Sequence, residues 1–236
     1  MRRITALPYA AGVPSPLPLF PLNTVLVPGL VLPLHIFEPR YRELIETLLE
    51  RPDEDSREFG IVAVRHGRDV ERDGLEALFP VGTATILRQA ERLDDGRFDI
   101  VTTGSRRFRI VEIDTSEPLV RAQVDFLADA TEPADEALAL QVSIAFRHYR
   151  EALSGQVESE VDIEGEDLPD DPTVLSYLVT AAMVLPTDQR QHLLAAPSTG
   201  ERLRRARRLL GTETALISAL SAVPAIDFGE PPTSPN

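Results

Sequence analysis

The sequence predicts an α+β fold in which a strand-rich first part is followed by a helical bundle. Short apolar runs punctuated by prolines fill residues 16–130, and amphipathic patterns with helical spacing fill residues 131–221. The pattern changes once, near Thr131, so we expect a β-rich subdomain and a helical subdomain. Residues 1–15 and 222–236 contain many prolines without apolar periodicity, which indicates a flexible leader and a disordered tail.

The β-rich part is predicted from six segments. The apolar runs at 17–22 and 25–37 are interrupted by prolines, which favours edge strands or bent strands and a closed or partly closed β structure. Residues 59–65 are typical of a buried strand, and residues 82–104 of a hairpin that turns at Asp94, Asp95 and Gly96. Two further strands are expected at 106–113 and 119–127, with Arg107 and Arg109 facing away from Phe108 and Ile110.

One helix is expected before residue 131, and four after it or near the end of the chain. The first begins at Pro39, and its apolar side chains share one face: Tyr41, Leu44, Ile45, Leu48 and Leu49. Residues 133–153 form a long amphipathic helix with Leu138, Val142, Ala145, Phe146, Tyr149 and Leu153 inward. Asp171 caps a third helix that carries Val174, Leu175, Leu178, Val179 and Ala182 inward, and Thr187 caps a short one. Ser198 and Glu201 form a capping box for the last helix, which buries Leu203, Ala206, Leu210, Ile217 and Leu220.

The composition is that of an ordinary globular protein, with 43% apolar and 26% charged residues. No apolar run is long enough to cross a bilayer and no secretory signal is recognisable, so a cytoplasmic protein without membrane association is expected. The absence of cysteine excludes disulfides, zinc–thiolate sites and cysteine nucleophiles. A net charge of −14 disfavours nucleic acid as a partner, because the average surface repels a phosphate backbone.

The residues required by common catalytic mechanisms are missing. All 24 basic residues are arginine, so neither a P-loop lysine nor a serine–lysine dyad is available. There is no G-x-S-x-G elbow, and the four histidines, His35, His66, His148 and His192, lie too far apart to form a known metal motif. His35 is expected to be a hydrogen-bonded structural histidine. We therefore predict no catalytic, cofactor or metal site, although an enzyme with an unrecognised carboxylate pair remains an alternative.

Three charged segments have both a structural and a functional interpretation. Residues 154–171 hold eight acids and no bases, which favours a solvated linker over a calcium site or a site for a basic partner. Five arginines at 202–208 are expected on the exposed arc of the last helix, paired with carboxylates; the alternative is a phosphate or RNA site. Glu38, Arg40 and Tyr41 are expected to fix the corner between strand and helix, with a pocket as the alternative.

Several segments resemble the amino-terminal substrate-binding domain of the Lon protease family, in its stand-alone bacterial form. The resemblance rests on LPLFPLNTVLVPGLVLPLHIFEPRYRELI at 17–45, FGIV at 59–62, VGTATI at 81–86 and GSRRFRI at 104–110. A helical segment at 185–210 adds to it, and the coverage is about residues 15–220. The resemblance implies a PUA-like pseudo-barrel, a helical bundle and a role in capturing protein substrates. This chain departs from full Lon proteases because it contains neither their ATPase module nor their peptidase.

The resulting prediction is a non-catalytic module that binds polypeptide segments or unfolded proteins, working with a separate protease or chaperone. Apolar surface around Phe20, Leu34 and Phe37, or the cleft between barrel and bundle, is the expected binding site, because burial of apolar surface supplies affinity with little sequence demand. The alternative is an RNA-binding PUA-like module that uses the arginines at 202–208.

Overall fold

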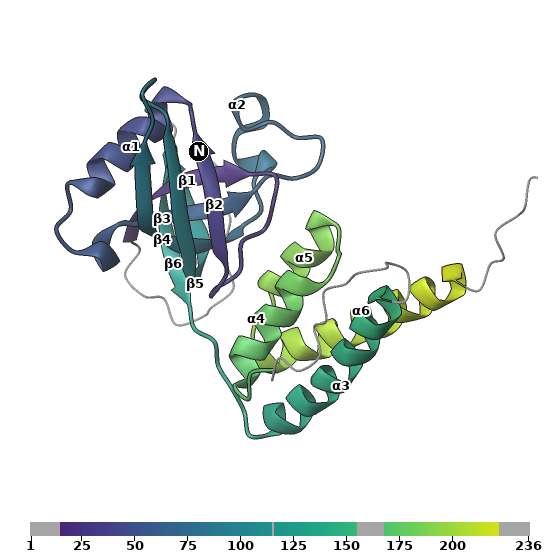
Figure 1. Ribbon diagram of the computed structural model, residues 1–236. Helices are drawn as coiled ribbons and strands as arrows, with labels where there is room; N and C mark the ends of the chain where they lie inside the picture. Colours follow the sequence, from purple (N-terminus) through teal and green to yellow (C-terminus); the bar gives the residue numbers. More distant parts are fainter. Residues whose placement is uncertain (1–14, 115, 155–167, 222–236) are drawn as a thin grey trace, which may run out of the picture.

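The computed structural model describes residues 15–114, 116–154 and 168–221. Its strands all lie before residue 131, with two helices among them, and the remaining described helices follow (Figure 1). This mixed fold agrees with the predicted order of elements. The predicted leader and tail, and most of the acidic segment at 154–171, lie outside the described residues. Among the described helices, none combines the length and the apolar character needed to cross a lipid bilayer.

Six strands form one sheet that closes on itself. The strand order is β2-β5-β4-β3-β1-β6, and β5 also pairs with β6. Five strands therefore form a ring, which we call the closed sheet, and β2 is added outside it. The strands are β1 (Ser15–Leu22), β2 (Val31–Ile36), β3 (Glu58–Ala63), β4 (Val81–Arg92), β5 (Phe98–Asp114) and β6 (Arg121–Leu127).

The length of β5 explains both the closure and the added strand. One edge of β5 pairs with β4 over most of its length. On the other edge, residues 98–103 pair with β2 and residues 107–114 pair with β6. The sequence predicted two strands here, separated at Gly104, and this was wrong. A Cβ at Gly104 would lie 2.5 Å from the carbonyl oxygen of Val27, so the glycine permits a close backbone approach and does not end the strand.

The apolar run at 25–37 is not one strand. Residues 25–27 are buried but irregular, and β2 begins at Val31. Pro28 and Gly29 form a turn in which the Leu30 N–H donates to the Val27 carbonyl at 3.2 Å, and Gly29 has a φ of 83°. The predicted hairpin between β4 and β5 is confirmed, with Gly96 at a φ of 81°.

Helix α1 (Pro39–Leu49) packs against one end of the closed sheet (Figure 1). Its buried residues agree with the predicted face except for Leu49, which is 38% exposed. Tyr41, Leu44 and Leu48 join a core that includes Phe20 of β1 and Phe59 of β3. Three short elements were not predicted: the 3₁₀ turns Glu54–Ser56 and Gly74–Ala77, and helix α2 (Val70–Asp73).

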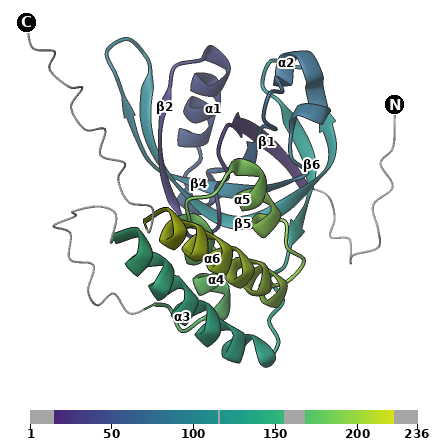
Figure 2. The same ribbon diagram turned by 90° about the vertical axis from the view of Figure 1, so that its right-hand side faces the viewer.

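The helical region contains α3 (Ala134–Ser154), α4 (Pro172–Ala182), α5 (Thr187–Leu194) and α6 (Thr199–Ser221). Helices α3 and α6 lie side by side (Figure 2), and α4 and α5 lie on the side of them that faces the closed sheet (Figure 1). Their shared core is fully buried at several positions, including Val142, Val179, Leu203, Ala206 and Leu210. Of the residues predicted on the inner face of α6, Leu220 is outside the part whose side chains are described.

Two of the three predicted helix caps are present. The Asp171 carboxylate accepts hydrogen bonds from the N–H groups of Thr173 and Val174, at 2.7 and 3.0 Å. Ser198 Oγ accepts from the Glu201 N–H at 3.2 Å, but the Glu201 carboxylate binds arginines and does not complete the capping box. Thr187 does not cap α5; it is the first residue of the helix, after Pro186.

Candidate functional site

Four side chains form a buried polar cluster where the closed sheet meets the helical region. Arg107 of β5 and Arg202 of α6 are 1% and 0% exposed, and both bind Oδ1 of Asp129, at 2.8 and 3.0 Å. The Tyr177 hydroxyl donates to Oδ2 of the same carboxylate at 2.6 Å. Arg107 also donates to the carbonyls of Leu194 and Ala196, at 2.9 and 2.6 Å. These bonds join strand, linker and helices at one point.

The electrostatics of this cluster favour a structural role. Two guanidinium groups share one carboxylate, and Arg202 also stacks on the Tyr177 ring at 3.9 Å. Burial raises the pKa of Tyr177 far above its usual range, so its hydroxyl stays protonated and donates to Asp129. Burial also lowers the pKa of Arg202. The prediction that Arg202 lies on an exposed arc was wrong. Arg202 and Arg107 are both buried, because their side chains are covered by elements distant in sequence.

An open apolar cavity of about 650 Å³ lies directly beside this cluster. We call it the junction groove. One wall is the turn at residues 27–30, with Ser105 of β5 and Asp129 next to it. The other wall is α4, through Thr173, Val174, Tyr177, Leu178, Ala181 and Ala182.

The groove wall on α4 differs from the prediction. Val174 was expected to face inward but is 52% exposed, and Ala182 is exposed as well. The reason is that α4 is covered on two sides: Leu175 and Val179 pack on the other helices, while Tyr177 packs on residues of the closed sheet. Val174 is left at the rim of the groove, where an apolar ligand can reach it.

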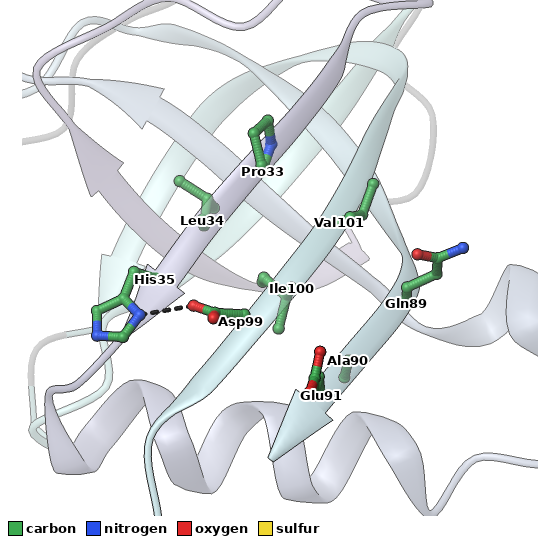
Figure 3. A pocket seen from close by; sticks show the side chains of 9 residues that line it. All are labelled: Pro33, Leu34, His35, Gln89, Ala90, Glu91, Asp99, Ile100 and Val101. Atoms are coloured by element: carbon green, nitrogen blue, oxygen red, sulfur yellow. Dashed lines mark hydrogen bonds and ion pairs between the residues drawn. The ribbon is translucent and has the colours of Figure 1, made fainter. Parts of the chain in front are cut away.

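A second hollow, of about 510 Å³, lies across β2, β5 and β4 (Figure 3). We call it the sheet hollow. The imidazole of His35 meets the carboxylate of Asp99 at 2.6 Å, and Arg97 contacts the other ring nitrogen at 3.0 Å. Glu91 is paired with Asp99 in the strand register, so the three polar residues form one row across the strands. His35 is hydrogen-bonded as predicted, but its side chain is 43% exposed and not packed in a core.

Comparison with known proteins identifies the family. The family model for the "ATP-dependent protease La (LON) substrate-binding domain" matches residues 16–212. This chain belongs to that family. The matched model describes a substrate-binding domain and no catalytic one.

Among related sequences, Lon protease 2 of Syntrophobacter fumaroxidans is 30% identical over 80% of this chain, and Lon protease 2 of Myxococcus xanthus is 25% identical over 92%. The chain spans about a quarter of the length of these curated relatives, 23% and 26%. A Lon N-terminal domain protein from Xanthomonas campestris has a similar structure, with a TM-score of 0.57 and 24% identity over 84% of this chain and 98% of that one. The N-terminal domain of a Mycobacterium avium complex Lon protease gives a TM-score of 0.60 at 19% identity, over 85% and 98%.

Within this LON domain, the three predicted binding residues are not together on one surface. Phe20 is 7% exposed and its ring stacks on Tyr41 at a centroid distance of 4.0 Å, so it belongs to the core. The prediction of a binding surface at Phe20 is therefore wrong, because the ring fills the space between β1 and α1. Leu34 is half-buried at the sheet hollow, and Phe37 is 61% exposed just beyond β2.

The corner at Glu38, Arg40 and Tyr41 has the structural role that was favoured. Arg40 and Glu38 form an ion pair at 2.6 Å, and Tyr41 is buried. The corner also borders a hollow between α1 and the start of β6, whose charged lining is mixed: Arg40, Glu43, Arg51, Glu117 and Arg121.

Apart from Arg202, the arginines of α6 are largely paired within the LON domain. Arg204 and Arg205 bind Glu201 at 3.1 and 2.8 Å, and Arg207 binds Gln141. Beside them, burial lowers the pKa of His192, and the nearby Arg205 lowers it further. The described residues contain no group of three or more acidic, histidine or cysteine side chains placed to hold a metal ion.

The buried cluster was missed from the sequence. The junction groove lies in the region of the predicted cleft between the strand-rich part and the helices, but its lining residues were not predicted. A signal for the cluster existed in GSRRFRI, where three arginines accompany an apolar strand that has to be buried on at least one side. The sequence alone does not distinguish Arg107 from a surface arginine. The structure does, because Arg107 binds the carboxylate of Asp129, which lies outside its own strand.

Proposed function

We propose that the protein binds unfolded or extended segments of other polypeptides through the junction groove, without catalysing a reaction on them. The groove carries this proposal. It is open and its walls are mainly apolar. Its polar side chains are Ser105, Asp129, Thr173 and Tyr177, whose hydroxyl is bound to Asp129. Apolar walls accept many sequences because burial of carbon surface supplies most of the affinity.

Membership of the LON substrate-binding domain family supports the same function. We further propose that the closed sheet is a PUA-like pseudo-barrel and the helical region a bundle, for which the ring of five strands and the shared helical core are the support. A separate protease or chaperone as a partner, and a cytoplasmic location, remain predictions from the sequence. RNA binding is not proposed, since the arginines that suggested it are mostly paired or buried.

Fluorescence anisotropy with a labelled, carboxymethylated and permanently unfolded polypeptide tests the proposal. The probe is expected to bind saturably, and Val174→Asp is expected to weaken binding at least about tenfold, because a charge replaces an apolar contact. Val111→Asp is the matched control: Val111 is 53% exposed, against 52% for Val174, and lies outside the groove. Equal affinity of the two variants would exclude the groove, and no binding by the unaltered protein would exclude the function.

A further inference from the structure

We propose that the open edge of β2 binds an extended polypeptide segment as an additional hydrogen-bonded strand. This inference rests on the proposed function and adds the mode of binding and the conformation of the bound segment. It also gives a role to Leu34, which lies in β2 and outside the junction groove.

β2 has a strand partner on one side only. It pairs with β5, and no other strand of the described residues reaches it. In an antiparallel pair, the N–H and the C=O of one residue point to the same edge of the strand. The edge they point to alternates from one residue to the next. The Gly104 N–H donates to the Leu30 carbonyl at 2.9 Å, which fixes this alternation at the start of β2. Residues 32, 34 and 36 therefore face β5, and Val31, Pro33 and His35 face the open edge.

The position of Pro33 supports this assignment. A proline has no N–H and fits into a strand only where the ladder does not need one. Pro33 is paired with Val101 in a continuous register, so its missing N–H falls on the open side. The open edge thus offers donors at Val31 and His35, and carbonyl acceptors at Val31, Pro33 and His35.

The same proline favours a different polypeptide over a second copy of this chain. Two β2 edges facing each other would each lack one donor, which weakens their pairing. An unrelated segment brings its own N–H groups and can donate to the Pro33 carbonyl.

The side chains of β2 indicate the chemistry of the bound segment. Leu32 and Leu34 lie on the same side of the strand as Ile36 and pack against the same core, yet they are only half-buried while Ile36 is 1% exposed. A neighbouring strand with apolar residues at alternate positions would cover them. Phe37, 61% exposed, lies on the other side, beside the His35 ring at a centroid distance of 6.5 Å, and is not part of this surface.

The edge is continuous with the junction groove. Leu30 lines the groove and immediately precedes Val31, the first residue of β2. One extended segment can therefore leave the groove and follow β2, whose six residues span about 20 Å at the usual rise of a strand.

Amide hydrogen exchange on the full chain tests strand addition without any substitution. With the carboxymethylated unfolded polypeptide bound, exchange at Val31 and His35 is expected to slow at least about tenfold, because both N–H groups gain an acceptor. Leu32 and Leu34, which already face β5, are expected to change less. Unchanged exchange at Val31 and His35 in the bound state would overturn the proposal.

Variants of the edge give a second test, in which binding is expected to weaken in two variants and to strengthen in a third. Val31→Pro and His35→Pro each remove one outward N–H, and each is expected to weaken probe binding about fivefold. Pro33→Val is the matched control: it supplies a third outward donor and is expected to strengthen binding about fivefold. General damage to the fold, monitored by thermal unfolding, does not produce this increase.

The outcomes separate this inference from the proposed function. If Val174→Asp abolishes binding while the three edge variants bind normally, strand addition is wrong and the groove remains the site. If the unaltered protein does not bind the probe, both proposals are wrong. A dimer in sedimentation experiments that Val31→Pro converts to monomer would show that a second copy occupies the edge, and would overturn the proposed occupant.

Discussion

Replacing Asp129 with asparagine tests the role of the buried polar cluster. The substitution keeps the size of the side chain and removes the carboxylate that binds both Arg107 and Arg202, at 2.8 and 3.0 Å. Removing one partner of a buried ion pair costs about 3 to 5 kcal/mol, because the remaining charge is left in a poorly solvated site. Asp129 is itself 23% exposed, so water partly compensates and the lower end, about 3 kcal/mol, is expected.

Urea unfolding followed by circular dichroism measures this loss, and thermal unfolding should show a midpoint lower by about 6 to 12 °C. Asp55→Asn is the control, since Asp55 is 76% exposed and pairs with Arg88 at 3.4 Å. The control is expected to change the free energy of unfolding by less than about 0.5 kcal/mol. If both variants lose the same small amount, the cluster does not hold the closed sheet and helices together, and the reasoning from burial is wrong.

Three further predictions concern single positions. Gly82→Ala should prevent stable folding or strongly lower the melting temperature, because the added Cβ would lie 2.5 Å from the Phe108 ring. Gly211→Ala on α6 should instead raise the free energy of unfolding by up to about 1 kcal/mol, because the added Cβ meets no other atom and alanine favours the helix. Asp171→Ala should destabilise the protein by about 1 kcal/mol in urea unfolding through the loss of the α4 cap, and an unchanged midpoint would contradict the cap. The pKa of Asp73 is lowered from 3.8 to about 2, chiefly by its hydrogen bond with Arg72, so its carboxylate signal in NMR should titrate near pH 2. The stability from this pair is then present above about pH 4 and lost as the pH falls toward 2; a midpoint near 3.8 would show that the pair does not form in solution.

Local patterns predicted most of the secondary structure. The apolar spacing of α1 and α3, the Asp94-Asp95-Gly96 hairpin and the Asp171 cap all depend on residues close together in the chain, and the structure contains each of them. The errors occurred where a local signal had a distant cause. Gly104 suggested the end of a strand, but it is needed because the Val27 backbone passes close to it.

The candidate site was less predictable than the fold. Phe20 was predicted to belong to an apolar binding surface, but the Tyr41 ring, from a different element, stacks on it, and no local pattern reveals that contact. The exposure of Val174 had no local signal either, because its helix buries two different faces against two different parts of the molecule.

By itself, the sequence determined the order of strands and helices, the lack of lysine and cysteine chemistry, and the motifs typical of a LON substrate-binding domain. Only the tertiary structure decided that the sheet closes, that β2 is left with an open edge, and that a groove forms beside α4. It also decided that Asp129 meets Arg202, 73 residues further along the chain. The physical reason is that strand pairing and burial of charge depend on partners brought together by the fold, whereas helical periodicity, turns and caps depend on neighbours in the chain.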